Sequence, residues 1–309
     1  MKIASVAALA LGAFAASTAI AQTSETSQPD TSADAAETSS GEIVVEGYRE
    51  QQVRDFLWRS LVETGGNLAK RTDPVCLGID NLPDTVTSEL RGRIQANLDD
   101  FQIPLAEPGC DINAVVVFHD NPQAFMNWLA SNRPVVFDAL YRPERNRLIR
   151  EKRQVYSWMF IPTAIPDRNR ADQNLIGTTL VPTASAAEIS RIPQGEPDSI
   201  SHSFTVVGTE MIDGMSIAQL GDYLTMQILI EFKPGKLEHA PRDSIMNLFF
   251  AGNPEDSAPQ EMSSLDRALV RGLYQPQRQR FNAGSIRGDV ARRSIRTLDD
   301  EGLLDQVDD

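Results

Sequence analysis

The stretch that decides the fold is SIAQLGDYLTMQILIEF, which runs from Ser216 to Phe232. Its start is a capping box, because the Ser216 side chain can accept a hydrogen bond from the backbone of Gln219 while the Gln219 side chain reaches back. Large apolar residues recur along one side at Leu220, Leu224, Ile228 and Phe232. Pro234 and Gly235 end the pattern. The stretch predicts a long helix whose apolar side packs against a sheet.

Helix and strand signals alternate on either side of this helix. Apolar residues at helical spacing predict helices over Thr87–Phe101, Asp120–Ala130, Arg142–Lys152 and Ser263–Tyr274. Runs of β-branched and aromatic residues predict strands over Ile112–Phe118, Val155–Ile161 and His202–Gly208. This alternation predicts a single α+β or α/β domain, in which helices pack on a mixed sheet in two or three layers.

The first 21 residues have the pattern of a signal peptide. Lys2 precedes an apolar run from Val6 to Ala16, and Ala19-Ile20-Ala21 has the small-x-small pattern of a cleavage site. The apolar run is too short to cross a bilayer comfortably. We therefore expect cleavage after Ala21 and a mature protein, without a membrane span, in the periplasm or outside the cell.

Composition divides the mature chain into three parts. Residues 22–42 are rich in Ser, Thr, Ala and acidic residues and lack apolar periodicity, which is typical of a disordered leader. Residues 43–275 carry the predicted globular domain. Residues 276–309 contain six arginines followed by the acidic ending LDDEGLLDQVDD, and we expect a charged, partly ordered tail that is helical.

The acidic balance limits the partners. The chain has 43 Asp and Glu against 29 Lys and Arg, a formal net charge of −14. Such a chain repels phosphate backbones and anionic lipid surfaces, so nucleic acid is not an expected partner.

Cys76 and Cys110 are the chain's two cysteines. In the oxidising compartment that export implies, such a pair indicates a disulfide. It would close a loop of about 34 residues and contribute roughly 4 kcal/mol in the loop-entropy description. The alternative is a pair of thiolate metal ligands, for which His119 is the candidate neighbour.

GEIVVEGYRE, residues Gly41–Glu50, resembles the TonB box of outer-membrane receptors, a short extended segment that pairs with a partner strand. On this interpretation Ile43, Val44 and Val45 would contact a TonB-type partner. A receptor also needs a plug and a barrel, for which this chain is too short. The other interpretation is an ordinary first strand or the end of the leader.

Three motifs carry a family resemblance: QLGDY at Gln219–Tyr223, SIM at Ser244–Met246 and LDRALVRGLY at Leu265–Tyr274. In this order they resemble an uncharacterised family of secreted bacterial proteins, over roughly Asp73–Tyr274, and that family implies no activity. They are also distantly similar to zincin-like peptidases, whose zinc helix is followed by a Ser-Ile/Val-Met turn and an Asp-containing helix ending in Leu-Tyr. This resemblance implies a zincin-like scaffold.

The QLGDY helix lacks the chemistry of a zinc peptidase. Such enzymes need two His one helical turn apart and a Glu beside the first of them. Gln219 and Tyr223 occupy the ligand positions here, and Leu220, which cannot take a proton, occupies the position of the general base. We expect a degenerate groove without metal or cofactor, with Met246 beneath the Gln219–Tyr223 side. Its candidate residues are Gln219, Asp222, Tyr223 and Met246.

Other catalytic signals are weak. The three histidines are His119, His202 and His239, and no two stand at ligand spacing. A composite metal site that adds Asp120, Asp213 or Glu238 is an alternative. The chain has no Gly-x-Ser-x-Gly elbow and no Gly-rich phosphate loop. We therefore expect a non-catalytic exported protein that serves binding or envelope association. The alternative is an active periplasmic hydrolase, metallopeptidase-like, with an unrecognised site.

Overall fold

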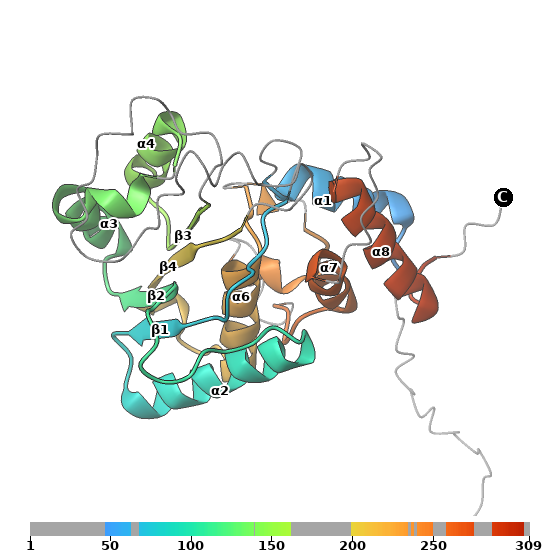
Figure 1. Ribbon diagram of the computed structural model, residues 1–309, viewed down its shortest axis with the longest axis horizontal. Helices are drawn as coiled ribbons and strands as arrows, with labels where there is room; N and C mark the ends of the chain where they lie inside the picture. The colour runs from blue at the N-terminus through green and yellow to red at the C-terminus, as the bar shows by residue number, and fades with distance from the viewer. Residues whose placement is uncertain are drawn as a thin grey trace, which may run out of the picture. The chain divides into compact units, whose positions relative to one another are not determined.

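The computed structural model describes residues 47–62, 68–138, 140–161, 199–233, 236–237, 240–249, 258–274 and 286–305 of the 309-residue chain. Within these residues a four-stranded mixed sheet packs against seven α-helices in a single α/β-type domain, as the sequence predicted (Figure 1). The strands are β1 (Leu77–Asp80), β2 (Ala114–His119), β3 (Val155–Phe160) and β4 (His202–Gly208). The helices are α1 (Glu50–Ser60), α2 (Asp84–Asp100), α3 (Pro122–Asn132), α4 (Arg142–Arg150), α6 (Ile217–Leu229), α7 (Ser264–Tyr274) and α8 (Ile286–Asp300).

Several predicted features lie outside the described residues. These are the signal peptide, the leader, Ile43, Val44, Val45, Glu238 and His239. The described part begins at Gly47, and Tyr48 pairs with Leu304 in an isolated β-bridge. Of the GEIVVEGYRE segment, the structure therefore describes only Gly47–Glu50, and Glu50 already begins α1.

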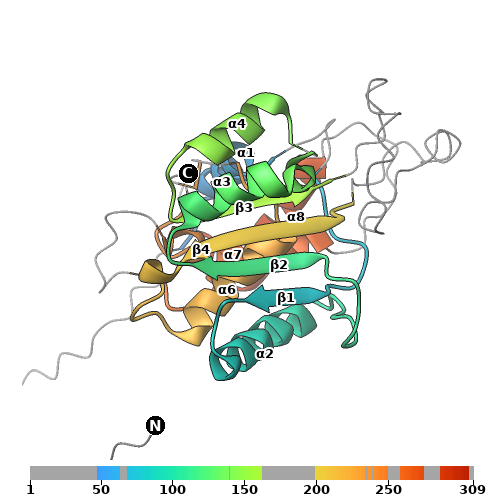
Figure 2. The ribbon, with the colours of Figure 1, turned by 90° about the vertical axis from the view of Figure 1, so that its left-hand side faces the viewer.

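The strand order in the sheet is β1-β2-β4-β3 (Figure 2). β1, β2 and β4 run parallel, and β3 runs antiparallel to β4 at one edge. Parallel neighbours need a crossover, which α2 supplies between β1 and β2. Ala114 pairs with Ser203 in the β2–β4 register, and Trp158 pairs with Phe204 in the β3–β4 register.

The sheet separates two apolar clusters. Side chains alternate between the faces of a strand, and β2 accordingly alternates buried with half-buried residues. Phe118 and Val207 point into the main core, which includes residues of α1, α2, α6, α7 and α8. Tyr156 and Val206 belong to a second cluster, with residues of α3 and α4. These two helices lie on the other face of the sheet (Figure 2).

The predicted central helix is α6, and its capping box is present. Ser216 Oγ accepts a hydrogen bond from Gln219 N at 3.1 Å, and Gln219 Oε1 accepts one from Ser216 N at 2.9 Å. The sequence predicted one apolar side, but the structure buries every residue from Gln219 to Leu229. The reason is that α2, α7 and the sheet all pack against α6, so its polar residues need partners inside the protein.

The C-terminal helix α8 lies beyond the predicted domain boundary at Gln275. We expected the residues beyond it to form a charged, partly ordered helix, and α8 packs against α7 and α1. Val290, Ala291 and Leu298 are fully buried in the main core. The charges of this segment masked an apolar side at helical spacing, which is the side that α8 buries.

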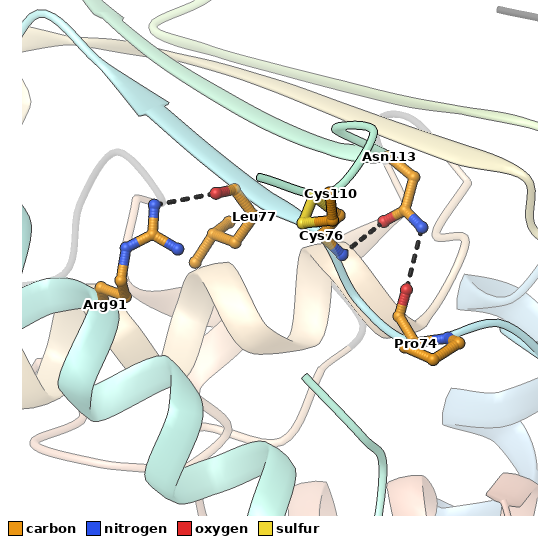
Figure 3. Close-up of a disulfide and its surroundings, with 6 residues drawn as sticks. All are labelled: Pro74, Cys76, Leu77, Arg91, Cys110 and Asn113. Carbon is orange, nitrogen blue, oxygen red and sulfur yellow. Dashed lines mark hydrogen bonds between the residues drawn. A yellow bond between two sulfur atoms is a disulfide. The ribbon is translucent and has the colours of Figure 1, made fainter. Parts of the chain in front are cut away.

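The predicted disulfide between Cys76 and Cys110 is confirmed (Figure 3). The two Cα atoms lie 6.0 Å apart, and the bond ties the start of β1 to the loop that precedes β2. Asn113 braces the same place, because its side chain accepts a hydrogen bond from Cys76 N and donates one to Pro74 O, each at 2.9 Å (Figure 3). The disulfide therefore closes a loop that contains α2.

Candidate functional site

Asp222, the acidic residue of the QLGDY motif, is fully buried where α6 crosses α2. Its carboxylate accepts two hydrogen bonds from the guanidinium of Arg93, at 2.7 and 2.8 Å. Asn97 Nδ2 donates to it at 2.8 Å, and the backbone N–H of Met262 donates at 2.7 Å. A buried carboxylate needs a cation and further donors to offset its lost hydration. Asp222 has both, so it joins α6, α2 and the segment before α7.

The residue before this aspartate, Gly221, lies where α2 packs closest to α6. A Cβ atom at Gly221 would lie 2.9 Å from Cβ and 2.5 Å from Cγ of Arg93, closer than van der Waals contact permits. These atoms are near the root of the Arg93 side chain and cannot swing away without moving α2. The glycine therefore allows the close approach of α2 to α6 that brings Arg93 to Asp222.

Gln219 and Tyr223, the residues at the ligand positions of the peptidase comparison, are 6% and 3% exposed. Gln219 Nε2 donates to Pro259 O at 2.9 Å, in addition to its role in the capping box. The Tyr223 hydroxyl accepts a hydrogen bond from Gln227 Nε2 at 2.9 Å. Burial raises the pKa of Tyr223. Leu220, between Gln219 and Tyr223 in the same helix, is also buried.

The SIM turn is held by Asp266 of the third motif. Ser244 Oγ and Ile245 N each donate to the Asp266 carboxylate at 2.7 Å, and Ser263 N donates at 3.1 Å. Burial raises the pKa of Asp266 to about 6, although these hydrogen bonds oppose the shift. Met246 follows in the same 3-10 turn and is 1% exposed. The aspartate thus ties the turn to the first residues of α7.

The four predicted groove residues are therefore interior residues. Met246 and Tyr223 belong to the same buried cluster, and Phe249, three residues after Met246, packs edge-on against the Tyr223 ring at 4.6 Å. The polar groups of α6 bind elsewhere, since Gln219 donates to Pro259 O and Tyr223 accepts from Gln227. With exposures of 6% or less, Gln219, Asp222, Tyr223 and Met246 do not line an open groove.

Tyr274 and Arg71 close the other end of α6, and sequence reasoning identified neither role. The Tyr274 hydroxyl donates to Leu229 O at 2.9 Å and accepts from Arg71 N at 3.0 Å. The Arg71 guanidinium donates to Ser203 Oγ at 2.8 Å and lies 3.5 Å from Ile228 O. A cation near the last carbonyls of a helix is favoured by the helix dipole. Burial lowers the pKa of Arg71 and raises that of Tyr274 to about 12.

The two described histidines lie at opposite ends of the sheet. His119 ends β2 and pairs with Gly208, whereas His202 begins β4 six residues earlier, so roughly 20 Å separates them along the strand. His119 Nδ1 accepts a hydrogen bond from Asn121 N at 2.9 Å. Burial, followed by the charge of Arg71, lowers the pKa of His202. In the part of the chain that the structure describes, no three His, Cys, Asp or Glu side chains group as metal ligands would.

The acidic neighbours proposed for a composite site have other surroundings. Asp120 follows His119 directly, but its carboxylate accepts a hydrogen bond from Thr209 Oγ1 at 2.7 Å. Asp213 is exposed in the turn that precedes α6. Neither carboxylate is therefore held in place beside a pair of histidines.

An aromatic hollow lies beside α3. It has a volume of about 340 Å³ and is lined by His119, Ala124, Phe125 and Trp128. The rings of His119 and Phe125 stack at 5.2 Å, and those of Phe125 and Trp128 stack at 5.8 Å. Trp128 is 51% exposed, which is unusual for so large an apolar side chain. This hollow is a surface feature that the sequence analysis did not identify.

Two further findings concern membrane spans and similarity to known proteins. Within the described residues, no helix has both the length and the apolar character needed to cross a bilayer. Comparison of the chain with protein-family models, curated proteins and solved structures finds no match. The contacts described above therefore carry the functional argument.

Proposed function

We propose that this protein is a non-catalytic, exported binding or envelope-associated protein built on a degenerate peptidase-like scaffold. The proposal includes cleavage after Ala21 and residence in the periplasm or outside the cell. It also includes the resemblance to secreted bacterial proteins that carry the QLGDY, SIM and LDRALVRGLY motifs.

The observation that supports the proposal is the use of the three motifs in internal contacts. Gln219 and Tyr223 stand where a zinc peptidase has its first two ligands, and both are buried and hydrogen-bonded within the protein. Leu220 has no group that could take a proton from water. Asp222 and Asp266 hold neighbouring elements together. The motif residues that resemble those of a zinc peptidase thus stabilise the fold through internal contacts.

Two further observations support export and binding. The Cys76–Cys110 disulfide is consistent with an extracytoplasmic protein, since such bonds persist in oxidising compartments. The aromatic hollow with exposed Trp128 has the composition of a contact surface, because aromatic residues are enriched at protein interfaces. Neither the disulfide nor the aromatic hollow depends on a catalytic activity.

The experiment is a peptidase assay combined with cell fractionation. Purified mature protein is incubated with a diverse peptide library, with and without added zinc and with a chelator as control. We expect no cleavage above the buffer background in any condition, and we expect part of the protein to sediment with the cell envelope. Cleavage that the chelator abolishes would contradict the proposal and support the periplasmic hydrolase instead.

A further inference from the structure

The negative charge of this protein is unevenly distributed. Residues 133–153 contain seven Lys and Arg against three Asp and Glu, a local charge of +4. The rest of the chain therefore carries −14 − 4 = −18. This basic segment includes α4, which lies on the face of the sheet opposite the main core (Figure 2).

α4 has one apolar side and one basic side. Leu148 is buried, and Ile149 packs beside it against the cluster on the sheet. Arg147 and Arg150, which are three residues apart, share the opposite side of the helix, and Arg142 lies at its margin; all three are exposed. Arg147 forms a loose ion pair with Glu151 at 3.6 Å. No ion pair of Arg142 or Arg150 occurs among the described residues.

Exposed residues also flank α4 at both of its ends. Tyr141 immediately precedes the helix and is 72% exposed, the highest value among the exposed large apolar residues of the described chain. Lys152 follows the helix and is exposed. Aromatic rings and basic side chains together are typical of protein surfaces that lie at the headgroup level of a bilayer. We define the α4 surface as Tyr141, Arg142, Arg147, Arg150 and Lys152.

We propose that the α4 surface binds the phosphate headgroups of an anionic phospholipid bilayer. The inference rests on the proposed function, because it names the envelope component with which the protein associates. Charge complementarity selects this partner, because each Arg or Lys near an anionic surface strengthens binding about fivefold.

The overall charge of −14 does not oppose this binding strongly. Charges are screened beyond about 8 Å at physiological ionic strength. In Figure 1, α4 lies on the other side of the sheet from α1, α7 and α8. A bilayer that contacts α4 would therefore interact chiefly with the basic segment. Repulsion from anionic lipids follows from the average charge of the chain, whereas this surface is basic.

The test is co-sedimentation of the mature protein with lipid vesicles. One set of vesicles contains phosphatidylcholine and phosphatidylglycerol in a ratio of about 3:1, and the other contains phosphatidylcholine alone. The test variant is R142Q/R147Q/R150Q, which keeps the side-chain stems and the helix. The control variant is R49Q/R59Q/R296Q, which removes three exposed arginines in and beside α1 and α8. Both variants lower the net charge equally.

We expect the wild type and the control variant to bind the anionic vesicles with affinities within about twofold of each other. The α4 variant should bind at least tenfold more weakly, since three cations are lost. The proposal would be overturned if the wild type bound both vesicle types equally, or if the control variant lost as much binding as the α4 variant. It would also be overturned if the protein bound a polyglutamate resin, tested in parallel, but not the anionic vesicles. If the protein is metal-free and inactive but does not bind the vesicles, only this inference is overturned. If it is an active zinc peptidase that binds the vesicles, only the proposed function is overturned.

Discussion

At the scale of single residues, the buried carboxylate of Asp222 joins three separate parts of the chain. The carboxylate receives hydrogen bonds from α2, through Arg93 and Asn97, and from Met262. A group placed for proton transfer would need access to substrate. Asp222 is fully buried and its oxygens are occupied, so its position serves packing.

Replacing Asp222 by Asn tests this structural role. Asn keeps the shape but leaves Arg93 without its counter-charge, and breaking one side of a buried pair is costly. Since Arg93 is 28% exposed, we expect the free energy of unfolding to fall by about 3 kcal/mol, measured by urea denaturation. The matched control is Asp100→Asn, whose pairs with Arg267 and Arg271 are exposed and should contribute less than about 1 kcal/mol. Equal losses in the two variants would contradict the account.

Glu231, just beyond α6, predicts a pH dependence. Burial, followed by repulsion from Glu144, raises its pKa from 4.5 to about 7. The folded protein therefore holds this proton more tightly than the unfolded chain does, and the stabilisation is present below pH 4.5 and lost as the pH rises through 7. Glu231→Gln should match the wild type near pH 4.5 and exceed it above pH 7, by at most about 3 kcal/mol.

The measurement is urea unfolding of both proteins at a series of pH values, and the difference between them is the result. Glu89→Gln is the control, because Glu89 is exposed on α2. Its difference from the wild type should stay constant with pH. A constant difference for Glu231→Gln as well would contradict the raised pKa.

Sequence reasoning at this scale found local relations but missed distant ones. The Ser216–Gln219 capping box was predictable because its partners are three residues apart. Arg93 lies 129 residues from Asp222, and no local pattern marks the pair. The buried role of Gln219 and Tyr223 was also hidden, because the residues that cover them come from other parts of the chain.

At the scale of elements, the crossing of α2 and α6 depends on Gly221. Gly221→Ala would force Arg93 and α2 to move, and overpacking of this kind costs about 1–3 kcal/mol. Gly92→Ala on α2 is the control, since nothing lies within 4 Å of its added Cβ. It should stabilise the protein by about 0.5–1 kcal/mol, because Ala is the better helix former. Thermal unfolding of the two variants gives the comparison, and shifts in the same direction would contradict the model of close packing.

The elements themselves were largely predictable. The strand His202–Gly208 has the predicted bounds, and α7 begins one residue after its prediction. β1 has only four residues, too few for a periodic signal. α1 was missed although Val53, Phe56 and Leu57 have helical spacing, because the preceding segment was interpreted as a strand or a TonB-type segment. α8 lies in the segment that we interpreted as a partly ordered helical tail, and its arginines hid the apolar side that packs into the core.

At the scale of the whole molecule, the disulfide should contribute a large share of the stability. It constrains a loop of 34 residues, so reduction or a Cys76→Ser/Cys110→Ser change should lower the free energy of unfolding by about 4 kcal/mol. Chemical denaturation with and without reductant measures this effect. The double variant, which has no disulfide, should have the same unfolding midpoint with and without reductant. An unchanged midpoint for the wild type after verified reduction would show that the loop entropy is offset elsewhere.

The central claim for the whole molecule is that a peptidase-like framework serves structure and not metal chemistry. The most direct measurement is the zinc content of mature protein isolated from the periplasm without chelator and dialysed against trace zinc, determined by mass spectrometry. The account predicts a zinc content far below one ion per chain, and the same content in the Gln219→Ala and Tyr223→Phe variants. Tyr223→Phe should lower the free energy of unfolding by about 1 kcal/mol, because one hydrogen bond is lost. One zinc ion per chain, lost in either variant, would contradict it.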